Sequence, residues 1–568
     1  MKVQETPHNS DVPEFAGAVL PYGEADRRAD ALVKQMSIDE KIGMLGGYAG
    51  FYLRGVSRLN IPTIKTSDGP MGVHNDGRAC AVPAAVALAA SWDEESAWEI
   101  GVALGRESRA RGVHVLLAPG VNIHRQPQCG RNFEYMGEDP YLAGQQAVAY
   151  IEGVQSQGVV ATVKHYAANS QDHERHHTSS DMDERTLREI YLPAFRAAVR
   201  EGGVCSVMTA YNLLNGVHCS ENHHLNNEIL RDEWGFGGYV ISDWGGVHTT
   251  GVLTGGNDLE MPKANYMNGE HIKPLLASGE LEEATIDMKV RRMLRTFIAM
   301  GFFERDQYDE RISWDESEHR EIALDVARKG MVLLKNDKLL PLNRDQIKRI
   351  AVVGPNTHPA VRGGGGSSRT TPFHETSILE GVQNIVGSKA HITHIPFAAA
   401  GRMEELVCRS TYTTTTSDGF RVFGMTASYY ADADPHSDPV ATRIETLLKW
   451  DYNSQNVPQG VDAENFAVRW AGKIQPETDG LHQLAVALSG SVRVWLDNEI
   501  VLEDTAAGYP LRLAQTLLDL QTGREYDLQI ELVQQERGGH FRFSWHHIDL
   551  EEISAADVVI FAAGYSHV

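Results

Sequence analysis

Asp243 and Trp244 are the adjacent residues in this sequence best suited to carry out chemistry. They follow an apolar and glycine-rich run over 237–242, where a buried strand is expected to end. A carboxylate at such a position can attack or stabilise an anomeric carbon, and an indole can stack on the apolar face of a pyranose. Aspartate also follows strands where it caps the next helix, so this pair alone leaves both interpretations open.

Other predicted strands also end in polar residues that suit a sugar ring. The set is Asp68 after 61–65, Arg131 downstream of 113–118, Lys164 and His165 after 159–163, and Met208 and Tyr211 within 204–212. A carboxylate accepts hydrogen bonds from sugar hydroxyls, and cationic side chains donate charge-assisted ones. Each residue alone also has a structural interpretation, such as Asp68 as a turn former or Lys164 on the surface. Together they indicate a sugar-binding site.

The order of these runs predicts the fold that positions the site. Between about 30 and 300, short β-rich runs alternate with amphipathic stretches at 94–111, 144–157 and 187–201. Strands separated by helices pair in parallel, so the pattern predicts a (β/α)8-type barrel. Active sites in such barrels lie where strands end and loops begin, which would place the polar set on one face.

The whole chain is predicted to be a multidomain α/β protein, because 568 residues exceed what one core holds. The predicted domains are a catalytic barrel with an N-terminal arm over 1–300, a linker over 301–325, the first part of an α/β sandwich domain over 326–404, an all-β insertion over 405–548, and a truncated continuation of the α/β domain over 549–568. The insertion alternates apolar with polar residues and has closely spaced turn signals, which is typical of a β-sandwich.

The composition limits the partners and the compartment. A formal charge of −24 argues against nucleic acid and anionic membranes as partners. Residues 1–17 show no signal-peptide pattern, and no apolar run is long enough to span a bilayer. The five cysteines are scattered, so reduced thiols and a cytoplasmic location are expected.

No metal or cofactor is expected. Histidines and a glutamate cluster at 173–177, but their spacing is not that of a His-Glu-x-x-His zinc motif. The glycine-rich segment Gly363–Gly366 lacks the Gly-Lys-Ser/Thr that a phosphate loop requires, so it is predicted to be a loop.

Several short motifs in this sequence resemble those of glycoside hydrolase family 3, of the β-glucosidase type. They are SDGP at 67–70, GRNFE at 130–134, KHYAAN at 164–169, MTAYN at 208–212, SDW at 242–244, and VLLKN at 332–336 followed by LPL at 340–342. The resemblance covers nearly all of 30–400. The insertion resembles the protective-antigen-type β-sandwich found in some members, through FAVRWAG at 466–472 and VRVWLD at 492–497.

The resemblance implies that Asp243 is the nucleophile of a retaining mechanism with a covalent glycosyl-enzyme intermediate. It implies that the non-reducing sugar is bound by Asp68, Arg131, Lys164, His165, Arg175, Met208, Tyr211 and Trp244, and Ser368 completes the predicted set. The expected substrate is a short oligosaccharide or an aryl glucoside with a terminal β-D-glucosyl residue. A β-xylosidase or a natural-product β-glycosidase of the same family, and a sugar-binding protein without turnover, remain alternatives.

Three features depart from the family pattern. His74 stands where many relatives have arginine, and 164–169 lacks the pattern of the branch that cleaves N-acetylglucosaminides. Relatives take their acid/base glutamate from just beyond the strand that 556–563 matches, whereas this sequence stops at Val568. We therefore expect the acid/base group to come from outside this chain, on a second polypeptide, and leave a homo-oligomer open.

Overall fold

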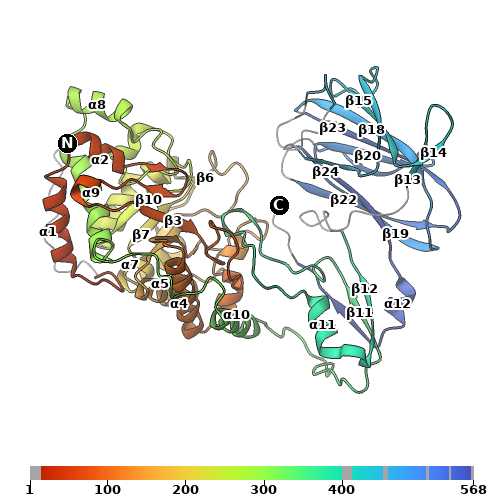
Figure 1. Ribbon diagram of the computed structural model, residues 1–568, viewed down its shortest axis with the longest axis horizontal. Coiled ribbons are helices and arrows are strands. Elements are labelled where there is room, and N and C mark those ends of the chain that lie inside the picture. Colours follow the sequence, from red (N-terminus) through yellow and green to blue (C-terminus); the bar gives the residue numbers. More distant parts are fainter. Residues whose placement is uncertain are drawn as a thin grey trace. The chain divides into compact units, whose positions relative to one another are not determined.

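The computed structural model describes residues 14–398, 412–451, 458–462, 464–506, 511–535 and 539–564. Most of the predicted N-terminal arm, Cys408 and the last four residues lie outside these ranges. The chain divides into two compact units (Figure 1): Met1–Lys335 with Arg362–His374, and Asn336–Val361 with Glu375–Val568. Each unit has its own sheets and apolar core, which confirms the predicted multidomain α/β class.

The first unit is built around a curved sheet of mostly parallel strands. Its parallel members, in spatial order, are β3 (Ile64–Asp68), β4 (Val115–Leu117), β5 (Val160–Tyr166), β7 (Ser206–Thr209) and β10 (Tyr239–Ser242). Each overlaps one of the predicted strands. The side chains of β4, β5, β7 and β10 are buried on both faces, which explains their continuous apolar runs.

Short segments close this sheet into a ring. An antiparallel pair, β1 (Gly47–Tyr48) and β2 (Tyr52–Leu53), extends the sheet beyond β3. At the other edge Leu259 bridges Ile241, and the next residue, Glu260, bridges Gly46 beside β1. The antiparallel pair departs from a regular (β/α)8 pattern because its hairpin is too short to include a helix.

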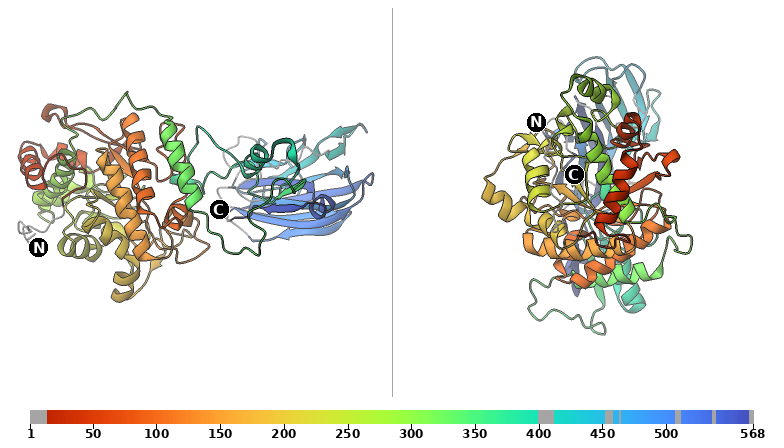
Figure 2. Two further views of the ribbon diagram at one scale, coloured as in Figure 1. Left: turned by 90° about the horizontal axis from the view of Figure 1, so that it is seen from below. Right: turned by 90° about the vertical axis from the view of Figure 1, so that its left-hand side faces the viewer.

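Helices surround the ring. They are α1 (Tyr22–Val33), α2 (Ile38–Met44), α3 (Ala85–Ala90), α4 (Glu94–Ala110), α5 (Pro140–Ser156), α6 (Glu184–Thr186), α7 (Pro193–Arg200), α8 (Gly269–Ser278), α9 (Glu283–Ala299) and α10 (Ser317–Lys329). Figure 2 shows α4 and α5, in orange, side by side. They approach closely because Gly101 and Gly153 lie at the crossing, where a Cβ on either would meet backbone of the facing helix at 2.3 Å.

The first unit extends beyond the predicted boundary at 300. Helix α10 covers part of the predicted linker and packs against α3 and α4. Residues 362–374 also belong to this unit, and Ala79 pairs with Pro372 there. The glycine-rich segment is thereby part of the barrel unit.

The second unit contains a small parallel sheet and a β-sandwich. The small sheet has the order β12 (His391–Ile395), β11 (Arg349–Val353) and β25 (Val558–Phe561), with α11 (Ile378–Val386) and α12 (Leu550–Ser554). The sandwich strands lie between β12 and β25 in sequence, as an insertion does. A single apolar cluster fills the space between the two sandwich sheets.

The larger sandwich sheet comprises β13 (Tyr412–Thr415), β14 (Arg421–Phe423), β15 (Met425–Tyr430), β16 (Ala441–Glu445), β18 (Phe466–Ile474), β20 (Ser491–Leu496), β21 (Glu499–Asp504) and β23 (Tyr526–Gln534). The smaller one comprises β17 (Lys449–Asp451), β19 (Gly480–Ser489), β22 (Arg512–Leu520) and β24 (His540–His547). In the described part of the chain, no helix has both the length and the apolar character needed to cross a membrane.

Candidate active site

The C-terminal ends of the parallel strands bring most of the predicted residues together. Asp68 is the last residue of β3, Lys164 and His165 lie near the C-terminal end of β5, and Met208 lies in β7. Asp243 directly follows β10. Because parallel strands end at one face of a barrel, these side chains share a single site although they are up to 175 residues apart in sequence.

Asp243 is held rigidly, with one carboxylate oxygen left free. Its Oδ1 accepts a hydrogen bond from the backbone N–H of Trp244 at 2.8 Å. Its carbonyl oxygen accepts from Ser242 Oγ at 2.9 Å. Oδ2 is buried and receives no hydrogen bond from the residues the structure describes. A buried carboxylate oxygen with unused lone pairs can act as a nucleophile or accept a hydrogen bond from a ligand.

The imidazole of His165 lies beside this oxygen, with Nε2 3.4 Å from Asp243 Oδ2. Arg131 Nη2 lies 2.9 Å from the same Nε2. An arginine N–H can only donate, so Nε2 accepts and the ring proton resides on Nδ1. Nδ1 lies 3.0 Å from the Tyr135 hydroxyl oxygen, which also accepts from Asn169 Nδ2 at 3.0 Å. Burial and the nearby Arg131 charge hold the pKa of His165 well below its usual value, so the ring is neutral.

Glu134 is the carboxylate partner of Arg131. Arg131 donates through Nε to Glu134 Oε1, and the Ser368 hydroxyl donates to Glu134 Oε2. Burial alone would raise the pKa of Glu134, but the Arg131 and Lys164 charges outweigh it and lower the pKa. The carboxylate is therefore ionised, and its interactions are with protein groups rather than directed at a substrate.

Asp68 has a different electrostatic environment. Burial is the largest cause of its raised pKa of about 6, and the negative charges of Asp243 and Glu134 act in the same direction. Lys164, itself buried, opposes the shift. The carboxyl is ionised at neutral pH and can then accept hydrogen bonds from two hydroxyls of a ligand.

The aromatic side of the site is formed by Trp244 and Tyr211. The Trp244 ring lies 5.0 Å from that of Phe51, and its buried Nε1–H meets no acceptor in the described residues. The Tyr211 hydroxyl donates to the Trp244 carbonyl oxygen at 3.1 Å. The guanidinium of Arg175 lies over the Tyr211 ring, 4.4 Å from its centroid. Unpaired polar atoms beside an aromatic floor suit a sugar ring.

Some residues of the site were not in the predicted set. Tyr135 and Asn169, which set the protonation of His165, lie next to or inside the motifs at 130–134 and 164–169, and this position is the signal that could have identified them. Glu134 lies inside the motif at 130–134 and was not predicted to be a site residue. Asn122 had no local signal, yet it accepts from the His165 backbone N–H at 2.8 Å and donates to its carbonyl at 2.9 Å. Among the described residues, no cluster of three or more His, Cys, Asp or Glu side chains could hold a metal ion.

Comparison with known proteins identifies the family of both parts of the chain. Residues 52–296 match the glycosyl hydrolase family 3 N terminal domain, and residues 422–557 match the PA14 domain. The beta-glucosidase of Rhizobium radiobacter is 38% identical over 482 residues, covering 84% of this chain and 57% of that protein. The probable beta-glucosidase K of Aspergillus fumigatus is 33% identical over 536 residues, covering 91% and 67%.

Solved structures show the same relationship. The beta-glucosidase of Kluyveromyces marxianus in complex with glucose superposes with a TM-score of 0.67 at 28% identity, covering 95% of this chain and 68% of that one. The chain spans between half and two thirds of the length of most curated relatives it matches. The predicted family and the protective-antigen-type insertion are both confirmed: this chain belongs to glycosyl hydrolase family 3.

Proposed function

We propose that this chain carries the nucleophile and sugar-binding site of a retaining β-glucosidase that removes terminal β-D-glucosyl residues from short oligosaccharides or aryl glucosides. The observation that carries the proposal is the buried, unpaired Oδ2 of Asp243 at the end of β10. The curated relatives named as beta-glucosidases, and the related structure that contains glucose, support glucose as the sugar.

In the first step Asp243 Oδ2 attacks the anomeric carbon as the bond from that carbon to the leaving oxygen breaks. The leaving oxygen takes a proton from the acid/base group. The sugar becomes an ester on Asp243, with inverted configuration at the anomeric carbon. In the second step the acid/base group removes a proton from water, which attacks the anomeric carbon, so the ester bond breaks and the original configuration returns.

The surrounding residues hold the sugar and keep Asp243 reactive. Asp68 accepts hydrogen bonds from sugar hydroxyls, and Lys164 donates hydrogen bonds to them. The ring of Trp244 packs against the side of the sugar that carries the leaving group. The neutral ring of His165 places no proton on Oδ2, so the nucleophile keeps its full negative charge. Glu134 orients Arg131, whose Nη2 donates to His165 Nε2.

We further propose that the acid/base carboxylic acid lies in a segment that these 568 residues do not include, and the greater length of the relatives supports this. Full hydrolysis of cellobiose by these 568 residues alone would contradict the proposal. The cytoplasmic location and the oligomeric state stay predictions.

A leaving-group series tests the activity directly. Glycosides with a very acidic leaving group need little proton donation, so this chain is expected to release 2,4-dinitrophenol from its β-D-glucoside, and much less phenol from phenyl β-D-glucoside. Preference for the matched 2,4-dinitrophenyl β-D-xyloside would contradict glucose specificity. Binding of glucose without release from either dinitrophenyl glycoside would favour a sugar-binding protein.

A further inference from the structure

A single buried carboxylate closes the loop that follows Asp68. Glu107 lies on α4, and its side chain is 1% exposed. Its Oε2 accepts a hydrogen bond from the backbone N–H of Val73 at 3.0 Å, and its Oε1 accepts one from the backbone N–H of Cys80 at 2.9 Å. One side chain therefore holds both ends of the loop segment 73–80.

Arg111, one helical turn beyond Glu107, binds the same carboxylate and the same loop. Its Nη2 lies 3.1 Å from Glu107 Oε1 and donates to the carbonyl oxygen of Arg78 at 2.8 Å. Its guanidinium lies over the ring of Trp314, 4.5 Å from the centroid. The Glu107–Arg111 pair thus forms hydrogen bonds to the loop backbone at its two ends and near its tip.

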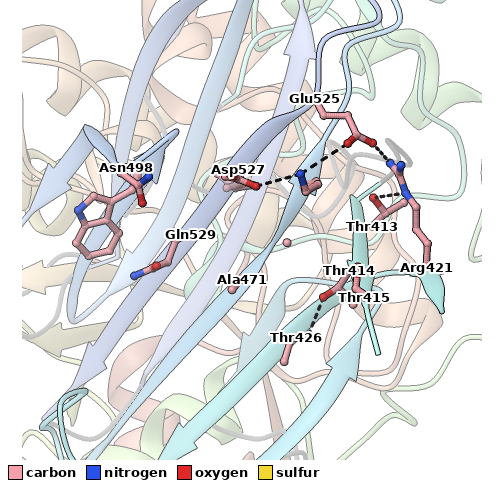
Figure 3. Close-up of a pocket in the computed structure, with 14 residues that line it drawn as sticks. Thr413, Thr414, Thr415, Arg421, Thr426, Ala471, Asn498, Glu525, Asp527 and Gln529 are labelled. Atoms are coloured by element: carbon pink, nitrogen blue, oxygen red, sulfur yellow. Dashed lines mark hydrogen bonds and ion pairs between the residues drawn. The ribbon is translucent and has the colours of Figure 1, made fainter. Parts of the chain in front are cut away.

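The Glu107–Arg111 pair differs from the ion pairs on the surface of the sandwich. Arg421 and Glu525 pair there with both side chains partly exposed, where water screens their attraction (Figure 3). The side chains of Glu107 and Arg111 are almost completely buried, which strengthens their hydrogen bonds. A buried ion pair is weak evidence for stability, because apolar side chains can often replace it without loss. Its hydrogen bonds to the loop instead fix where the loop lies.

The loop is held from another side by the segment that follows the glycine-rich residues 363–366. Thr370 Oγ1 donates to the carbonyl oxygen of Met71 at 2.9 Å. The backbone N–H of Ala79 donates to the carbonyl oxygen of Thr371 at 3.0 Å. The loop is therefore anchored by two separate parts of the barrel unit, and the Glu107 carboxylate supplies the anchor on α4.

Asp68 lies close to the part of the loop that Glu107 holds. The backbone N–H of Gly72 donates to the carbonyl oxygen of Gly69 at 3.2 Å, so the chain turns directly after Asp68. A Cβ on Gly69 would lie 3.2 Å from Cα of Val73, which shows how closely these residues pack. A shift of Val73 would therefore move Gly69 and the carboxyl group of Asp68. Misplacement of a substrate-binding group by about 1 Å can slow a reaction by about 100-fold.

We propose that Glu107 is a positioning residue that acts through the loop 69–80 and holds the Asp68 carboxyl group where it binds the sugar. The proposal rests on the proposed function, in which Asp68 accepts hydrogen bonds from sugar hydroxyls. Both oxygens of Glu107 are occupied by protein donors, so it acts on the sugar only through the loop. Glu107→Gln keeps the size of the side chain but turns one acceptor into an NH2 group that faces a backbone N–H.

The test is a double-mutant cycle between Glu107→Gln and Asp68→Asn, measured as kcat/KM for 2,4-dinitrophenyl β-D-glucoside. The active fraction of each protein is counted by titration with 2,4-dinitrophenyl 2-deoxy-2-fluoro-β-D-glucoside, so that misfolded protein does not register as a lower rate. We expect Glu107→Gln to lower kcat/KM at least about tenfold when Asp68 is present. In Asp68→Asn it should lower kcat/KM less than about threefold, because the group that it positions is already lost.

Asp26→Asn is the matched control, because Asp26 is also a buried carboxylate of the barrel unit and pairs with Arg295 at 2.9 Å. It should change kcat/KM less than about twofold with or without Asp68, even if the midpoint of unfolding in urea falls. Equal losses from Glu107→Gln in both backgrounds would indicate a merely structural role and overturn the proposal. An unchanged kcat/KM in Glu107→Gln would overturn it as well.

Arg111→Lys is a milder second variant, so that the test does not depend on the folding of Glu107→Gln. Lysine keeps the charge beside Glu107 but offers one nitrogen to both the carboxylate and the Arg78 carbonyl oxygen. It should lower kcat/KM at least about threefold when Asp68 is present, and less than about 1.5-fold in Asp68→Asn. Equal losses in the two backgrounds would again contradict the positioning role.

The affinity of the same proteins for glucose separates this proposal from the glucosidase function. A native chain that binds glucose but releases no dinitrophenol would contradict the glucosidase function. The affinities would then decide the role of Glu107, and Glu107→Gln should weaken binding at least about tenfold with Asp68 and less than about threefold without it. The absence of both glucose binding and turnover in the native chain would overturn both proposals.

Discussion

The Oδ2 atom of Asp243 lies 3.4 Å from Nε2 of His165, yet the two do not share a hydrogen. Arg131 already donates to that nitrogen, and the ring proton is on the far side, toward Tyr135. A histidine at this distance would usually be a hydrogen-bond donor to the carboxylate. Here it is a neutral neighbour that leaves the nucleophilic oxygen unprotonated and directs Arg131.

Replacing Asp243 with alanine should lower turnover of 2,4-dinitrophenyl glucoside by several powers of ten, because the covalent path is lost. Azide added to the variant should restore part of the rate and yield an α-glucosyl azide, since it enters from the face that the carboxylate occupied. Asp232→Ala, at an exposed position, is the control and should keep full activity. Activity of Asp243→Ala above a tenth of the native value would show that another group is the nucleophile.

Tyr135→Phe should both destabilise the protein and slow the reaction. The change removes the acceptor for two buried donors, His165 Nδ1–H and Asn169 Nδ2–H. Each unsatisfied buried donor costs about 1–3 kcal/mol. Without that acceptor the proton on His165 can move to Nε2, toward Asp243. The midpoint of unfolding in urea and kcat should therefore both fall. An unchanged kcat with lowered stability would contradict the role given to this tautomer.

Because the pKa of Asp68 is raised in the folded protein, this carboxyl should lower the stability of the protein as the pH rises. Folded Asp68 holds its proton up to about pH 6, whereas the unfolded carboxyl releases it near 3.8, so the native state binds more protons between these values. Stability relative to Asp68→Asn should therefore fall as pH rises from 4 to 7, by on the order of 2–3 kcal/mol. Urea midpoints of both proteins across this range measure the difference. A difference independent of pH would show that the carboxyl is not perturbed.

The same carboxyl should shape the pH dependence of catalysis. Below about pH 6 it is protonated and loses acceptor capacity for sugar hydroxyls, so kcat/KM for the dinitrophenyl glucoside should decline there. In Asp68→Asn that part of the decline should disappear, although the overall rate is much lower. Persistence of an identical acid limb in the variant would assign it to another group.

Ser368→Ala tests the link between the glycine-rich loop and the site. Its hydroxyl donates to the buried Glu134 carboxylate, so its loss should cost about 1–3 kcal/mol of stability and reduce kcat/KM by loosening Arg131. The adjacent Ser367→Ala is the matched control, because Ser367 only accepts a long 3.4 Å hydrogen bond from Arg131. Equal effects of the two substitutions would refute a specific role for Ser368.

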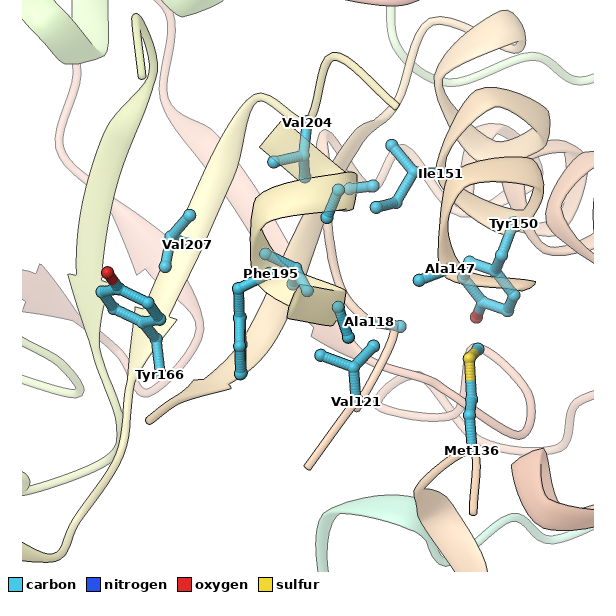
Figure 4. Packing of buried hydrophobic residues seen from close by; sticks show 14 of the residues in the cluster. Ala118, Val121, Met136, Ala147, Tyr150, Ile151, Tyr166, Phe195, Val204 and Val207 are labelled. Carbon is cyan, nitrogen blue, oxygen red and sulfur yellow. The ribbon is translucent and has the colours of Figure 1, made fainter. Parts of the chain in front are cut away.

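The apolar pattern predicted the barrel because helix and strand periods are strong in this sequence. Tyr150 and Ala147 of α5, Phe195 of α7 and Val207 of β7 pack into one core, as their spacing requires (Figure 4). The helix predicted over 187–201 is divided into a π-helical turn and α7, which begins at Pro193. Proline lacks an N–H and fits the first turn of a helix, so the break has a local cause.

The ring closure could not be predicted. Leu259 and Glu260 join the two edges of the sheet through isolated bridges, and no strand-like run marks them. The shared position of the predicted polar residues could be predicted, because parallel strands all end at the same face of a barrel. The proton of His165 depends on Tyr135, Asn169 and Arg131 acting together, and such a network is set by side-chain geometry rather than by spacing.

The most direct measurement is intact-mass spectrometry of the purified protein before and after incubation with 2,4-dinitrophenyl 2-deoxy-2-fluoro-β-D-glucoside. The fluorine slows both steps and the activated leaving group needs little acid, so the glucosyl ester should accumulate. We predict one added 2-deoxy-2-fluoroglucosyl group, located by peptide mapping to Asp243 and absent from Asp243→Asn. No adduct, or an adduct on a different carboxylate, would contradict the assignment of Asp243 as the nucleophile.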